Sequence, residues 1–162
     1  MSPMPAIARK PLRIGLLAAV YTITAVLGLR MDAVSDFATL VWAPTGLSIA
    51  AMLLFGRGLW PGVAIGALAA NLWNGASVPL AAGIAVGNTL EALLAAWIVG
   101  VPRDFRASLD RLRDAVLFVF AVLAGATVSA SGGVASLVAR GAAEGGLSET
   151  WRAWWVGDVI GG

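Results

Sequence analysis

Hydrophobic residues form long runs along most of the 162-residue chain, and short polar segments separate these runs. The runs are rich in Ala and Leu and do not alternate between polar and apolar positions, which favours helices over strands. A helix that crosses a bilayer needs about 20 apolar residues. The pattern therefore predicts an all-α, polytopic transmembrane helix bundle. We expect five complete spans plus the start of a sixth, at residues 12–29, 38–55, 61–73, 79–99 and 115–138, and from 156 onward.

Proline residues punctuate three of these runs. Pro61 and Pro79 stand at expected helix starts, where the missing N–H costs nothing. Pro44 lies inside the second run, so it either kinks that helix or marks its late start at Thr45 or Gly46. The pattern leaves both possibilities open.

The composition agrees with a membrane environment. Hydrophobic residues make up 59% of the chain and charged residues only 12%, whereas soluble domains are about one quarter charged. With short connections between the spans, eight Lys and Arg residues fall on the side of the N-terminus and three on the other side. Because cytoplasmic loops carry the excess of basic residues, we expect a multi-pass protein with a cytoplasmic N-terminus.

The chain has no cysteine and no histidine. It therefore lacks thiolate chemistry, the commonest metal ligand and the commonest general base near neutral pH. No glycine-rich phosphate loop follows a strand, and no acidic pair has metal-binding spacing. We expect no catalytic activity, no metal and no cofactor. The net charge of +2 reflects topology, so we expect no nucleic-acid partner.

Small residues recur every four positions on three of the expected spans. Such stripes let helix backbones approach closely, so they predict a tightly packed bundle. The stripes are Gly62, Gly66 and Ala70; Gly83 and Gly87, with Glu91 at the next position of the same spacing; and Ala121, Gly125, Ser129 and Gly133.

Strongly polar residues at membrane depth are the candidates for a ligand or signal-coupling site, because burying them is costly. They are Asn71, Asn88, Glu91 and Asp158. Asn88 and Glu91 are three residues apart and share a helix face. A glutamate in this setting carries a proton or pairs with a donor on another helix. It either fixes the bundle through an interhelical hydrogen bond or lines a site for a ligand, a proton or an ion.

Several short motifs occur in a family order. They contain Trp42, Pro44, Thr45, Gly46, Gly56, Arg57, Trp60, Pro61 and Gly62, then the run Gly87-Asn88-Thr89-Leu90-Glu91, and finally Trp155, Gly157 and Asp158. In this order the chain resembles the membrane-associated sensor domain of the first type (MASE family). That domain is the N-terminal input module of bacterial histidine kinases and of GGDEF/EAL proteins.

The resemblance implies a sensor domain over residues 1–162 that is truncated at its C-terminus. Such a domain lies in the bacterial inner membrane and regulates a cytoplasmic kinase or cyclic-di-GMP output domain, which this chain lacks. Its expected partners are the lipid bilayer, that output domain, and either a membrane protein or a second copy. Intramembrane Asn88 and Glu91 also suit a small membrane transporter or transporter subunit. A third hypothesis is a fragment with only a packing role.

Overall fold

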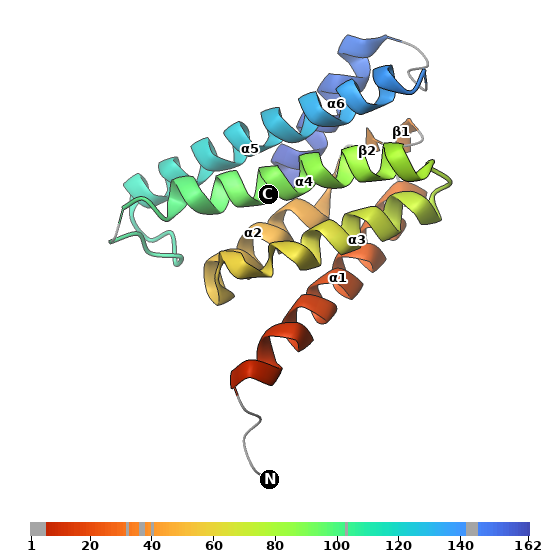
Figure 1. Ribbon diagram of the computed structural model, residues 1–162. Helices are drawn as coiled ribbons and strands as arrows, with labels where there is room; N and C mark the ends of the chain where they lie inside the picture. Colours follow the sequence, from red (N-terminus) through yellow and green to blue (C-terminus); the bar gives the residue numbers. More distant parts are fainter. Residues whose placement is uncertain (1–5, 32, 36–37, 40, 103, 142–145) are drawn as a thin grey trace.

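The computed structural model describes residues 6–31, 33–35, 38–39, 41–102, 104–141 and 146–162. Six α-helices make up most of these residues (Figure 1). They are α1 (Ala6–Met31), α2 (Ala43–Phe55), α3 (Trp60–Trp73), α4 (Val78–Val99), α5 (Leu112–Ala139) and α6 (Leu147–Gly161). A short antiparallel pair, β1 (Ala33–Ser35) with β2 (Ala38–Thr39), follows α1, and a 3-10 turn, η1 (Arg57–Leu59), joins α2 to α3.

The prediction of five complete spans and the start of a sixth is wrong. Within the described residues, only three helices are long and apolar enough to cross a membrane: Lys10–Arg30 of α1, then α4 and α5. The expected spans at 38–55 and 61–73 form helices of 13 and 14 residues. At 1.5 Å per residue these are about 20 Å long, whereas the hydrocarbon core is about 30 Å thick. The expected start of a sixth span, from 156 onward, belongs to the 15-residue helix α6.

The second run is shorter than expected because its helix starts late. α2 begins at Ala43 with Pro44 in its first turn, so the proline initiates the helix and does not kink it. Gly56 follows the helix with φ of 97°, a conformation that favours glycine. The chain therefore turns directly from α2 through η1 into α3.

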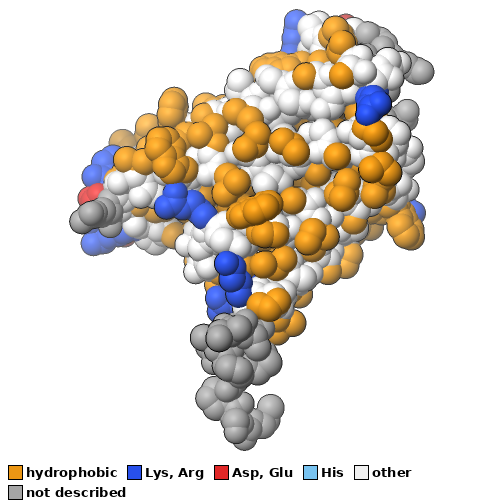
Figure 2. Space-filling view, in the orientation of Figure 1, with side chains coloured by type: hydrophobic (Ala, Val, Ile, Leu, Met, Phe, Trp, Pro, Cys, Tyr) orange, Lys and Arg blue, Asp and Glu red, His pale blue; other side chains and the backbone are white. Residues whose placement is uncertain are grey.

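Helix α4 is the centre of the bundle. It packs against α5, α3 and α2, while α1 packs on α3 and α6 packs on α5 (Figure 1). Many large apolar side chains lie on the outside of the bundle, and Figure 2 shows hydrophobic groups over much of one face. An apolar exterior around a packed interior is the arrangement that a bilayer requires.

The glycine stripes pack as predicted. A Cβ atom added at Gly66 would lie 2.7 Å from Cβ of Tyr21, and one added at Gly125 would lie 3.0 Å from the carbonyl oxygen of Glu91. At Gly133 the ring of Trp154 is 2.5 Å from that position. These glycines let α1 approach α3, α4 approach α5, and α5 approach α6 closely.

The ion pairs of the described chain lie in the connection between α4 and α5 and in the first turn of α5. Arg113 Nη2 lies 2.9 Å from an oxygen of Asp104 and 3.2 Å from one of Asp114. Hydrogen bonding from Arg113 lowers the pKa of the exposed Asp104 carboxyl below its ordinary value of 3.8. Asp114 is fully buried and also accepts a hydrogen bond from the backbone N–H of Arg106.

Candidate functional site

Six polar side chains meet inside the bundle. Every one is at most 3% exposed, and together they come from five of the six helices. We call this group the polar centre. It consists of Tyr21 (α1), Thr45 (α2), Asn88 and Glu91 (α4), Ser129 (α5) and Asp158 (α6).

Asn88 connects three helices through its side-chain amide. Its Nδ2 donates to the hydroxyl oxygen of Tyr21 at 2.7 Å, and its Oδ1 accepts from the hydroxyl of Ser129 at 3.0 Å. The amide therefore uses both its donor and its acceptor across helix interfaces. Hydrogen bonds of this kind hold membrane helices in register.

Thr45 joins the two carboxyl groups of the centre. Its hydroxyl oxygen lies 3.3 Å from Oε2 of Glu91 and 3.3 Å from Oδ1 of Asp158. A hydroxyl carries a single hydrogen, so it serves as a full donor to only one carboxyl at a time. The Thr45 oxygen can only accept a hydrogen bond from the other carboxyl, and that carboxyl must be protonated to donate it.

The two carboxyl groups have no cationic partner in the described chain. The ion pairs found there all involve residues 104–114. Oε1 of Glu91 and Oδ2 of Asp158 are also buried, and neither has a hydrogen-bond partner within the part of the chain that the structure describes. Buried polar groups are nearly always satisfied, so these two oxygens are the feature of the centre that most needs a physical explanation.

The junction between α2 and α6 fixes Thr45 beside Asp158. The backbone N–H of Trp42 donates to the carbonyl oxygen of Gly157 at 2.8 Å. At Gly46 an added Cβ would collide with the carbonyl oxygen of Gly161. The motif residues Trp42, Gly46 and Gly157 therefore create the close approach that places one hydroxyl between two acids.

Three of the four polar candidates expected from the sequence come together here: Asn88, Glu91 and Asp158. Asn71 lies elsewhere, and its Nδ2 donates to the Ala67 carbonyl of its own helix at 2.9 Å. Tyr21 was missing from the candidates, although it is the single tyrosine of the chain and lies within an apolar run. A hydroxyl-bearing side chain within an apolar run was the signal that could have identified it.

Other motif residues have local structural roles. Pro61 stands in the first turn of α3, and Gly62 packs against the backbone of Ile14. Trp155 Nε1 donates to the Thr127 hydroxyl at 3.1 Å near the surface. Arg57 and Trp60 are exposed at the turn into α3.

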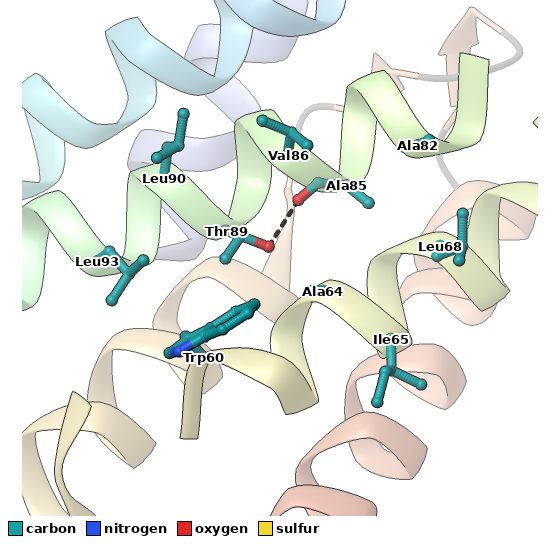
Figure 3. A pocket seen from close by; sticks show the side chains of 10 residues that line it. All are labelled: Trp60, Ala64, Ile65, Leu68, Ala82, Ala85, Val86, Thr89, Leu90 and Leu93. Atoms are coloured by element: carbon teal, nitrogen blue, oxygen red, sulfur yellow. Dashed lines mark hydrogen bonds between the residues drawn. The ribbon is translucent and has the colours of Figure 1, made fainter. Parts of the chain in front are cut away.

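The outer surface between α3 and α4 contains a separate groove of about 440 Å³. Figure 3 shows that apolar side chains such as Ile65, Leu68 and Leu93 line it, with Trp60 beside them. Among the described residues that line it, Thr89 has the only hydroxyl, which donates to the Ala85 carbonyl at 2.6 Å. The groove thus presents an apolar surface suited to the bilayer, and the polar chemistry lies inside the bundle.

Membrane helices packed around a buried polar centre define an integral membrane protein without a separate soluble domain among its described residues. A comparison with protein families identifies it further, because the MASE1 family model matches residues 13–162. The chain therefore belongs to the MASE1 family of membrane-associated sensor domains, as the motif order had indicated. No curated protein and no solved structure matches it.

Proposed function

We propose that the chain is a signal-input domain of the bacterial inner membrane that regulates a cytoplasmic histidine kinase or cyclic-di-GMP enzyme. Membership of the MASE1 family supports the sensory role. The start of α1, the α2–α3 turn and the α4–α5 connection lie on the same side of the bundle (Figure 1). Most Lys and Arg residues belong to these segments, which supports a cytoplasmic location for that side and for the N-terminus.

The polar centre is the observation that carries this proposal. A sensor needs two packings of its helices that a stimulus stabilises unequally. Because Asn88, Thr45 and their partners connect five helices, a change in one pairing alters the packing of several helices at once. Small helix displacements of this kind are a common way to transmit a signal.

The test uses a MASE1 protein that carries a GGDEF domain, with substitutions at the positions that match this chain. Asn88→Ala removes the bridge between α1, α4 and α5, and Glu91→Gln removes an acid while keeping its shape. We expect each variant to insert into the membrane normally and to change cyclic-di-GMP production several-fold, because the balance between the two packings shifts.

The matched control is Asn71→Ala. Asn71 is as buried as Asn88, at 3% against 2% exposed, but its Nδ2 donates to a carbonyl of its own helix. We expect this variant to retain the output of the parent protein. Unchanged output in both polar-centre variants would leave the centre with a packing role alone and would refute the proposed coupling.

A further inference from the structure

Two buried carboxyl oxygens point to a bound ligand. Oε1 of Glu91 and Oδ2 of Asp158 have no hydrogen-bond partner among the residues that the structure describes, and these two residues are 1% and 0% exposed. An interhelical hydrogen bond alone would not require two acids, since Asn88 and Ser129 form one with neutral groups. Two acids without a countercharge in a low-dielectric interior are costly, and a positive charge between them lowers that cost.

The surroundings of the pair supply oxygen atoms and no positive charge. α1 contributes the hydroxyl of Tyr21, α5 that of Ser129, and α2 that of Thr45, whose oxygen lies 3.3 Å from an oxygen of each carboxyl. Among the described residues, no Lys or Arg and no further acid acts on the pair from any packed helix. Carboxylate and hydroxyl oxygens are ligands that small hard cations prefer.

We propose that Glu91 and Asp158 bind one monovalent cation between them, either a proton or a sodium ion, with the hydroxyl oxygens of Thr45 and Ser129 as neutral partners. This inference rests on the proposed function, because it names the species that the polar centre responds to. A proton comes from water and returns to water, so one O–H bond forms and breaks on the pair. A sodium ion binds and leaves without any covalent change.

Release of the cation has a direct mechanical consequence. Glu91 lies on α4 and Asp158 on α6, and Thr45 of α2 contacts both. Without the cation, two negative charges repel each other across a poorly screened interior. That repulsion favours separation of α6 from α4 at the point where α2 holds them together. Occupancy of the site therefore selects between two packings of these helices.

The first experiment examines the purified 162-residue chain in lipid nanodiscs by infrared spectroscopy at neutral pH. Exposed carboxyls are ionised there, so a carbonyl stretch from a protonated carboxyl reports a buried acid. We expect this band in the parent chain, and we expect it to disappear in Glu91→Gln and in Asp158→Asn if the cation is a proton. Asp104→Asn, which removes an exposed loop carboxylate, should retain the band.

The second experiment measures the thermal unfolding midpoint while sodium replaces choline at constant ionic strength. If the cation is sodium, the midpoint of the parent chain rises by several degrees, because a ligand that binds only the folded state stabilises it. Glu91→Gln and Asp158→Asn should be insensitive to sodium, while Asp104→Asn should respond like the parent. Each variant removes one of the two acids, so a single variant that folds is enough for the comparison with the parent chain.

The inference is overturned if the parent chain has no protonated-carboxyl band and its midpoint responds to sodium no more than the midpoints of the two variants. The proposed function fails in a distinguishable way. If Asn88→Ala changes cyclic-di-GMP output but no cation binds, the sensory role of the centre stands and the cation does not. If the cation binds but neither Asn88→Ala nor Glu91→Gln changes cyclic-di-GMP output, the cation site stands and the sensory role of the centre does not.

Discussion

Asn88 and Asn71 form a natural pair for testing whether the polar centre holds the bundle together. Both asparagines are buried in helices of the same bundle. Asn88 makes two hydrogen bonds to other helices, at 2.7 and 3.0 Å, whereas Asn71 bonds to the carbonyl of Ala67 within its own helix. Replacing each by alanine removes the same atoms but different connections.

The expected difference follows from the number of interhelical bonds. Hydrogen bonds between membrane helices contribute about 0.6 kcal/mol on average and up to about 1.7 kcal/mol each. Asn88→Ala also leaves the hydroxyls of Tyr21 and Ser129 without their partner. We therefore expect Asn88→Ala to lower the free energy of unfolding by about 1–3 kcal/mol. Asn71→Ala should cost less than about 1 kcal/mol, because alanine has the higher helix propensity.

Reversible unfolding of the purified chain in mixed micelles, by titration with a denaturing detergent, measures both values. A double-mutant cycle with Tyr21→Phe isolates the bond to the tyrosine, for which we expect a coupling energy of about 0.6 kcal/mol or more. Equal destabilisation by the two alanine variants, together with no coupling to Tyr21, would refute the reasoning.

Three further substitutions test other parts of the structure. Gly133→Ala should destabilise the chain by about 1–3 kcal/mol in the same titration, because the new Cβ meets the ring of Trp154 at 2.5 Å and the packed interior must shift. Gly132→Ala is its control, since the nearest atom there is 3.5 Å away, and equal losses at the two glycines would contradict the packing of α5 on α6. Thr45→Val should cost about 1–3 kcal/mol because it removes the hydroxyl that contacts both acids, whereas Thr45→Ser should unfold like the parent chain. Unchanged stability in Thr45→Val would show that the hydroxyl does not bridge the acids. Arg113→Ala should raise the pKa of Asp104 toward 3.8 in an NMR titration, because the arginine donor lowers that pKa. A lowered pKa means that any stability from this pair is present above pH 3.8 and is lost as the pH falls through the pKa of the folded state, and an unchanged Asp104 titration in the variant would exclude the interaction.

The sequence predicted the helical class, the glycine stripes and all three acidic and amide members of the polar centre. These features can be recognised in the sequence because each depends on the type and spacing of residues within one segment. Glu91 and Asp158 stand in or beside apolar runs, and their burial demands a partner wherever the chain folds. Glycines repeated at every fourth position mark a helix face that approaches another backbone.

The number of spans was not predictable from the same runs. Hydropathy reports that a segment is apolar but does not fix where its helix begins and ends. Residues 38–42 continue the second apolar run, yet the helix starts at Ala43 beside Pro44. Residues 61–73 are apolar throughout most of their length, but η1 and the turn at Asn74 and Gly75 limit that helix to 14 residues.

The hydroxyl members of the centre were also hard to recognise in advance. Serine and threonine in membrane helices commonly bond to a carbonyl of their own helix, and Thr22, Thr89 and Ser136 do so here. Thr45 and Ser129 differ because helices distant in the sequence bring polar partners to them. That information lies in the tertiary packing and not in the local pattern.

The central claim is that α2 and α6 meet at the polar centre, with Thr45 against Asp158. The natural absence of cysteine allows a direct measurement, in which Thr45→Cys and Asp158→Cys are combined and oxidised in native membranes. The side-chain oxygens of Thr45 and Asp158 lie 3.3 Å apart, and disulfides form between cysteines on neighbouring backbone positions, so the account predicts a cross-link between these positions. It predicts little cross-linking when Thr45→Cys is combined with Ile160→Cys, because Ile160 is 60% exposed on the outer side of α6. No cross-link at 45 and 158, or equal cross-linking in the two pairs, would contradict the arrangement.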